Sequence, residues 1–196
     1  METLYFSFDI ESDGPVPGIN SLMSIGIAII DANKKIRYAY EINLKPLESA
    51  QQDENKVIIL SKNKDRYDYL TKDQQDPQEI FSIFKIIIDY LNKKYIIIPI
   101  AWSASSDWQF LNYYFCKFTG SNPVGNYCKC ISSYLWSVTK SKDHNIDDEL
   151  YKKYEEEYKE KKYGPLTNAK YQGFIFINIF DNNTLNNSIL SNYIVN

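Results

Sequence analysis

The first third of the chain carries three apolar runs that predict β-strands. Residues 5–11 alternate aromatic and polar side chains, residues 23–30 are apolar almost throughout, and residues 36–42 alternate again. The continuous run predicts a fully buried strand, and the third run predicts a strand with one wet face. Turn residues at 31–35 join the last two runs, so we expect three consecutive strands in an antiparallel meander.

Two later segments repeat their apolar residues with a helical period. Asp76 has the character of an N-cap, Pro77 suits the first helical position, and the following apolar face predicts a helix to about Leu91. We expect a loop over 103–106 and a second helix that opens at Asp107. Its apolar face consists of Trp108, Phe110, Leu111, Tyr114, Phe115 and Phe118, and Gly120 and Pro123 end it.

The segments around these helices are less regular. Residues 43–75 are polar and weakly periodic, which predicts an extended connection with one or two helical turns. Residues 95–102 read as a fourth strand, and Pro99 inside it predicts a bulge or an early end, because proline removes a ladder donor. Residues 127–131 predict a short fifth strand.

The last third is predicted to be helical. We expect a helix over 132–139, a charged surface helix over 147–162 with favourable i,i+4 pairs, and a final helix over 167–180 after the break at Gly164-Pro165. The asparagine-rich tail 181–196 is expected to pack as a short helix or to fray.

Length, charge and cysteine content narrow the class of protein. A chain of 196 residues predicts a single domain over 1–196. The net charge of −3 argues against a surface that grips a long duplex through many phosphates. Three cysteines, with only Cys128 and Cys130 close together, disfavour a zinc site and suggest buried free thiols. Without a signal peptide or an apolar stretch long enough to span a bilayer, we expect a cytoplasmic protein with no membrane partner.

The candidate chemistry begins at the end of the first strand. Asp9 and Glu11 are two residues apart, so a strand directs both carboxylates to the same side. Two such carboxylates repel each other, and a hard divalent cation such as Mg²⁺ or Mn²⁺ would relieve the repulsion. An Asp-x-Glu pair is also common by chance, and a solvated strand end is the alternative.

Two longer motifs favour the site over the chance pair. The first runs Asp9-Ile10-Glu11-Ser12-Asp13-Gly14-Pro15-Val16-Pro17-Gly18, and the second runs Ser106-Asp107-Trp108-Gln109-Phe110-Leu111-Asn112-Tyr113-Tyr114-Phe115. With them, the chain resembles the DEDD superfamily of 3'-5' exonucleases, in the RNase T and oligoribonuclease branch, over about residues 5–180. The resemblance implies an α/β, ribonuclease-H-like fold: a mixed five-stranded sheet, with a three-strand antiparallel meander and parallel strands, flanked by helices.

The third motif of that family is altered here. The family has a histidine and, after four residues, an aspartate; in the matching run Leu166, Ala169 and Gln172 keep the register. Tyr163 then stands at the histidine position and Asn168 at the aspartate position. The only histidine, His144, lies upstream with a spacing one residue short, and we interpret it as a loop residue.

The resemblance also implies a mechanism and a ligand set. Two metal ions would clamp the scissile phosphate, with Asp9 bridging both, Glu11 and Asn168 completing one, and Asp107 holding the other. Tyr163, with a pKa near 10, is a poor base but can orient water. Because three carboxylates remain instead of four, we expect a weakened Mg²⁺ or Mn²⁺ site.

Substrate contacts and partners follow from the same resemblance. The loop from Gly14 to Met23 and the ring of Trp108 are candidates for holding terminal bases, and Asn112 for a polar contact. The alternatives are that Trp108 and Phe110 are core residues, which we favour for Phe110, and that Asn112 is a surface residue. We expect the 3' end of single-stranded nucleic acid as the partner, with RNA favoured, and a homodimer as an option.

Three hypotheses remain open at this point. The chain is an impaired exonuclease, or a catalytically inactive, nuclease-derived module that binds nucleic acid or a protein partner, or a nuclease in which Asn168 is an engineered change. The last hypothesis explains Asn168 but not Tyr163. The survival of Asp9, Glu11 and Asp107 together favours the exonuclease.

Overall fold

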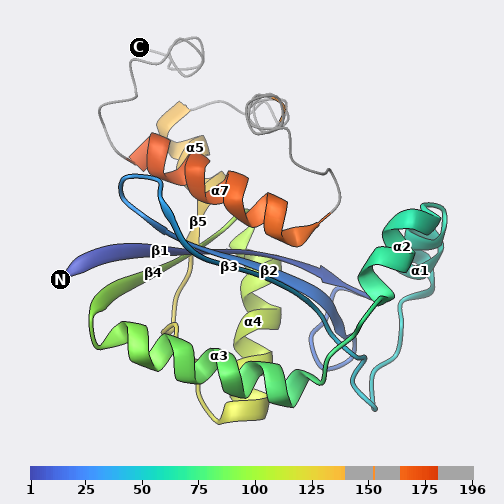
Figure 1. Ribbon diagram of the computed structural model, residues 1–196. Coiled ribbons are helices and arrows are strands. Elements are labelled where there is room, and N and C mark those ends of the chain that lie inside the picture. Colours follow the sequence, from blue (N-terminus) through green and yellow to red (C-terminus); the bar gives the residue numbers. More distant parts are fainter. Residues whose placement is uncertain (140–151, 153–163, 181–196) are drawn as a thin grey trace.

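A mixed five-stranded sheet forms the centre of the computed structural model, which describes residues 1–139, 152 and 164–180 (Figure 1). The strand order is β3-β2-β1-β4-β5. The strands are β1 (Glu2–Ser12), β2 (Leu22–Asp31), β3 (Ile36–Asn43), β4 (Tyr95–Ala101) and β5 (Lys129–Cys130). The helices are α1 (Glu54–Ser61), α2 (Lys64–Thr71), α3 (Pro77–Asn92), α4 (Ala104–Thr119), α5 (Ile131–Thr139) and α7 (Pro165–Phe180).

The pairing confirms the predicted meander. β1 pairs antiparallel with β2, and β2 pairs antiparallel with β3, whereas β4 lies parallel to both β1 and β5. Every residue of β2 is buried, as its continuous apolar run predicted. No residue of β3 is fully buried, so the prediction of one wet face was too narrow: β3 is an edge strand and both of its faces reach solvent.

Helices cover both faces of the sheet. Figure 1 shows α3 and α4 on one face and α5 and α7 on the other. On the first face Phe81 of α3 packs against Tyr114 and Phe115 of α4, with ring centroids 5.3 and 4.9 Å apart. On the second face α7 is buried along most of its length against β1 and β2, where Ala169 and Ile177 belong to the core. The sheet is therefore a shielded platform, and α7 lies directly on its central strands.

The connection after β3 differs from the prediction. Residues 43–75 contain two helices of eight residues each, α1 and α2, instead of one or two turns. Asn63 caps α2 by accepting a hydrogen bond from the backbone N–H of Arg66, at 3.2 Å. Leu70 alone is buried among the described side chains of α2, so the segment lacks the apolar stripe by which a helix is recognised. Both helices stand beyond the carboxyl end of β1 (Figure 1).

Two local predictions were wrong. Helix α4 begins at Ala104, because Ser106 bonds back to the carbonyl of Ser103, and Asp107 therefore lies within its first turn. Strand β4 runs through Pro99 without a bulge, in register with Phe6. On the other side, β5 pairs with β4 only at Ile100 and Ala101, so the ladder between these two strands begins after Pro99.

The remaining predictions agree in part. The N-cap at Asp76 is confirmed, since its side chain accepts from the N–H of Glu79. Strand β5 is two residues long and shorter than predicted, α5 agrees within one residue, and α7 starts two residues earlier, at Pro165. The charged helix over 147–162, apart from Lys152, and the tail over 181–196 lie outside the described residues.

The structure also bears on two other expectations: that the cysteines are buried and that no segment spans a membrane. All three cysteines are free, but Cys116 is exposed and Cys128 and Cys130 are half-buried, which corrects the expectation of buried thiols. Within the described residues, no helix combines the length and the apolar character needed to cross a membrane.

Candidate active site

The candidate site forms where β1 meets α7. Asp9 of β1 lies opposite Gly26 of β2 in the antiparallel register. A Cβ atom on Gly26 would lie 2.1 Å from the backbone of both Pro165 and Leu166, so only glycine lets the first turn of α7 approach the sheet this closely. This contact sets α7 above Asp9.

Two amides of α7, four residues apart, bind the Asp9 carboxylate. Asn168 donates from Nδ2 to Asp9 Oδ2 at 3.1 Å, and Gln172 donates from Nε2 to Asp9 Oδ1 at 2.9 Å. The carbonyl oxygen of Gln172 accepts from the backbone N–H of Trp102 at 3.1 Å, which fixes the orientation of that amide. Asp9 is thus held from α7 and, through Gln172, from the end of β4.

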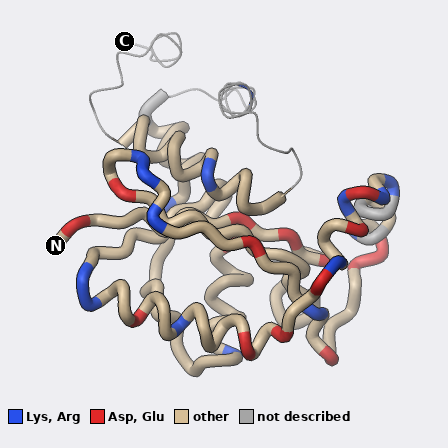
Figure 2. Tube along the Cα trace, in the orientation of Figure 1, with Lys and Arg blue, Asp and Glu red and all other residues tan. Residues whose placement is uncertain are grey.

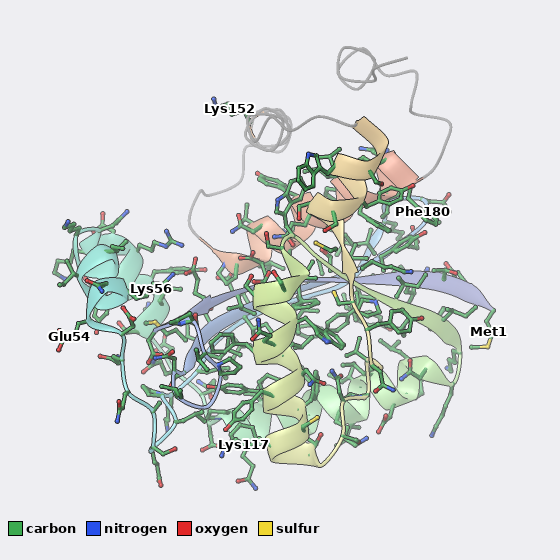
Figure 3. The ribbon with its side chains drawn as sticks, turned by 180° about the vertical axis from the view of Figure 1, so that it is seen from behind. Met1, Glu54, Lys56, Lys117, Lys152 and Phe180 are labelled. Atoms are coloured by element: carbon green, nitrogen blue, oxygen red, sulfur yellow. The ribbon has the colours of Figure 1, made fainter. Side chains whose placement is uncertain are left out.

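Glu11 forms ion pairs with two basic side chains of the α1–α2 segment. Arg66 donates from Nη2 to Glu11 Oε1, and Lys56 Nζ lies 3.8 Å from Glu11 Oε2. Figure 3 shows Lys56 on α1, beside the end of β1. Glu11 itself is buried, so these two side chains neutralise a carboxylate that burial would otherwise penalise.

Asp107 approaches from the first turn of α4. Ser106 donates its hydroxyl to Asp107 Oδ1 at 3.0 Å. The other oxygen, Oδ2, is buried and has no hydrogen-bond partner. Burial is the main cause that raises the pKa of Asp107 to about 8, and the charges of Asp9 and Glu11 raise it further.

The Asp9 carboxyl is perturbed in the same way. Burial raises its pKa to about 7, the hydrogen bond from Asn168 opposes the shift, and the charge of Glu11 adds to it. The charge of Glu11 thus acts on both Asp9 and Asp107, although these residues come from β1 and α4. Figure 2 shows acidic positions on the strands of the sheet and both acidic and basic positions on the α1–α2 segment.

The donor set suits a hard divalent cation only in part. Asp107 Oδ2 is buried without a partner, and each Asp9 oxygen retains acceptor capacity beyond its one amide bond, which is the chemistry that Mg²⁺ or Mn²⁺ prefers. Glu11 is already engaged by Arg66 and Lys56. Accordingly, no three His, Cys, Asp or Glu side chains in the described part of the chain are arranged to hold an ion.

Two of the residues predicted to contact substrate, Gly14 and Met23, are buried in the structure. Gly14 is buried, and the side chain of Asn20 fills the space beside it. Met23 belongs to β2, not to the preceding loop, and its side chain is buried against Leu70. The loop predicted over residues 14–23 therefore ends before Leu22, and the substrate contact at Met23 stays a prediction.

The two candidates on α4 are half-buried. Trp108 packs on the core, with its ring 6.4 Å from that of Phe8, while Phe110 is a core residue as we favoured. Asn112 accepts a hydrogen bond from Asn122 at 3.1 Å, so its carbonyl oxygen is engaged within the protein. The other predicted participant, Tyr163, lies outside the described residues, as does His144.

Sequence reasoning missed several residues of the site. Gln172 served only as a register marker of the third motif, and its position four residues after Asn168 could have placed it on the same helix face. Ser106 was assigned to a loop. Arg66 and Lys56 carried no signal, because they reach Glu11 from a segment 45 or more residues away that was predicted to be mostly extended.

Comparison with known proteins finds nucleases. The chain is 33% identical over 138 residues to the 3'-5' DNA exonuclease Cap18 of Escherichia coli, a match that covers 69% of this chain and 70% of that protein. No family model matches the chain.

Solved structures share the ribonuclease-H-like fold at low identity. The nuclease domain of 3'hExo, a DEDDh family member bound to rAMP, aligns with a TM-score of 0.58 and 12% identity over 92% of this chain and 93% of that domain. A full-length 3'-exonuclease gives a TM-score of 0.63 and 14% identity over 93% and 84%. The zinc-bound complex of E. coli ExoI with ssDNA gives 0.59 and 10%; the match spans 98% of this chain and 43% of ExoI. These likenesses confirm the predicted fold.

Proposed function

This chain belongs to the DEDD superfamily of 3'-5' exonucleases, and we propose that it hydrolyses nucleotides from the 3' end of single-stranded nucleic acid at the site around Asp9. The observation that carries the proposal is the grouping of three carboxylates in a partly buried site, where the charge of Glu11 raises the pKa of both Asp9 and Asp107. Burying negative charge costs stability, and carboxyl groups perturbed in this way cluster at functional sites.

The residues of the chain have distinct parts in this proposal. A divalent cation, Mg²⁺ or Mn²⁺, would polarise the scissile phosphate and activate the attacking water when bound. Asp9 and Asp107 would supply oxygens to it, Asn168 and Gln172 hold Asp9 in orientation, and Tyr163 stays the predicted candidate for orienting the water. We propose that turnover is slow, because Asn168 contributes an amide where a carboxylate would bring a further negative charge.

The proposed function does not specify whether the substrate is DNA or RNA. The curated relative is a DNA exonuclease by name, and the solved neighbours include proteins bound to rAMP and to ssDNA. The sequence favoured RNA, and the name of the relative supports DNA. DNA and RNA strands of one sequence therefore belong in the same assay. The homodimer and the cytoplasmic location stay predictions.

A second candidate function is a nuclease-derived module that binds without cutting. This function is favoured because protein side chains already partner two of the carboxylates: two amides bind Asp9, and two cations face Glu11. In this case the protein would bind a nucleic-acid end or a protein partner and release no nucleotide.

Release of the terminal nucleotide separates the two functions. We expect a 3'-labelled oligonucleotide to lose its label in the presence of Mn²⁺, and Asp9→Ala to abolish the loss. Asn168→Asp should raise the rate at least tenfold by adding a hard, charged oxygen, and this variant also tests whether Asn168 is an inactivating change. Gln109→Glu, an added carboxylate on the exposed part of α4, is the matched control. Binding of the strand by the wild type without release in any of these conditions would favour the module.

A further inference from the structure

Glu11 differs from the other two carboxylates of the site, because both of its oxygens already face cations. Arg66 donates to Oε1, and Lys56 lies 3.8 Å from Oε2. Among the described residues, the ion pairs of this site reach Glu11 alone. Asp9 instead accepts neutral amide hydrogens, and Asp107 accepts one hydroxyl hydrogen. The direct ion pairs of the site are therefore concentrated at Glu11, while the charge of Arg66 acts on Asp9 from farther away and lowers its pKa.

The two cations stand at the outer side of the site. The side chain of Glu11 is 11% exposed, whereas those of Arg66 and Lys56 are 39% and 38% exposed. Both come from the α1–α2 segment beyond the end of β1 (Figures 1 and 3). Both cations are therefore more exposed than the carboxylate that they neutralise.

The charges limit how many metal ions the site can accept. When all three carboxylates are ionised, as they must be to hold a metal ion, they and the two side-chain cations leave one negative charge. One divalent cation makes the site positive by one, and a phosphodiester then neutralises it. A second divalent cation would add two positive charges beside Arg66 and Lys56, which would repel it in a partly buried setting where charges act strongly.

The carboxylate oxygens that keep free acceptor capacity belong to Asp9 and Asp107, not to Glu11. Asp107 Oδ2 is buried, unpartnered and belongs to a residue that is only 6% exposed. Asp107 also interacts electrostatically with Asp9, whose oxygens can accept further bonds. These are the hard oxygen donors that Mg²⁺ and Mn²⁺ select.

We infer that this site takes one divalent cation, at Asp9 and Asp107, and that Arg66 with Lys56 supplies at Glu11 the positive charge that a second ion provides in a two-ion site. The inference rests on the proposed function in one respect: the phosphodiester that neutralises the site is taken to be that of a nucleic-acid substrate. The number of ions does not require that the chain cleaves anything, so the two proposals can fail separately.

Counting bound Mn²⁺ tests the inference. The metal-free protein is titrated with Mn²⁺, and free Mn²⁺ is measured by electron paramagnetic resonance, without substrate. We expect one ion per wild-type chain and its loss in Asp107→Asn. Two ions per wild-type chain, or none, would overturn the inference whatever the variants do.

Removing the positive charges of Arg66 and Lys56 should allow a second metal ion to bind. In the double variant Arg66→Gln, Lys56→Gln we expect two ions per chain, with the first bound about tenfold more tightly because repulsion is removed. Lys64→Gln is the control: it removes a lysine of α2 that pairs with Asp68 and is largely exposed, and it should keep one ion. An unchanged count in a folded double variant, verified by circular dichroism, would contradict the inference. A chain that binds one ion but releases no nucleotide would refute the proposed function alone.

Discussion

At the scale of single residues, the site depends on side chains that satisfy two partners at once. Gln172 is the clearest case, since its amide donates to Asp9 and accepts from the N–H of Trp102 while the residue is 1% exposed. Hydrogen bonds of this kind matter most when one partner is removed, because the buried group left behind has no water to replace it.

Replacing Gln172 should therefore cost stability and activity together. Gln172→Ala leaves a carboxylate oxygen and a backbone N–H unpaired, and we expect the free energy of unfolding to fall by about 2–4 kcal/mol. Urea unfolding measures this. Gln109→Ala, at an exposed position, should change it by no more than about 0.5 kcal/mol. Equal effects of the two variants would show that Gln172 does not hold Asp9.

The raised pKa of Asp107 predicts a pH effect on the metal-free protein. Its folded pKa of about 8 lies above the unfolded value near 4, so the folded state holds the proton more tightly than the unfolded chain. This carboxyl is not penalised below about pH 4, and its contribution to stability falls as the pH rises from there to about 8.

Asp107→Asn removes that titration. We expect the variant to gain stability relative to the wild type as the pH rises from about 5 to about 8, by at most about 1.4 kcal/mol per pH unit. The measurement is urea unfolding in a chelator at several pH values. A difference between the two proteins that stays flat or shrinks over this range would contradict the shifted pKa.

At the scale of elements, the position of α7 determines whether the site exists. Its first turn rests on Gly26, opposite Asp9, and the contact is with backbone atoms that cannot rotate away. Asn168 and Gln172 reach Asp9 only from this distance.

Gly26→Ala should push α7 off the sheet. We expect a loss of roughly 1–3 kcal/mol from overpacking, and a loss of nucleotide release beyond what instability explains, measured at a temperature where the variant is folded. Ala39→Ser, on the edge strand β3, is the control and should be close to neutral. A Gly26→Ala protein of wild-type stability and activity would show that the close approach is dispensable.

Sequence patterns predicted some of these elements and not others. Strand β2 and helix α3 were predictable because their apolar residues follow one period and Asp76 caps α3. Helices α1 and α2 were not, since α2 buries only Leu70 among its described side chains and no stripe marks it. The sequence motifs predicted Asp9, Glu11 and Asp107 as site residues. They did not predict Arg66, because an ion pair between residues far apart in the sequence has no local signature.

At the scale of the whole molecule, the charge limits how nucleic acid can be bound. The chain has a net charge of −3, and the cations found at the site are those of Arg66 and Lys56. A strand end held mainly at such a site contacts few phosphates, which is consistent with an enzyme of strand ends and not of long duplexes.

Affinity for a single strand should accordingly depend weakly on salt. With about two phosphates neutralised, the slope of log K against log salt is expected to be no steeper than about −2. Fluorescence anisotropy with a labelled oligonucleotide and Asp9→Ala protein measures it without cleavage. A slope of about −4 or steeper would require a larger basic surface than this account contains.

The central claim is that the chain removes nucleotides from a 3' end at the carboxylate site. The most direct test compares a 5'-labelled linear single strand with a circular strand of the same sequence, in Mn²⁺. We expect a ladder of products shortened from the 3' end of the linear strand, an intact circle, and no products with Asp9→Ala. A cut circle, an uncut linear strand, or a ladder that persists in Asp9→Ala would contradict it.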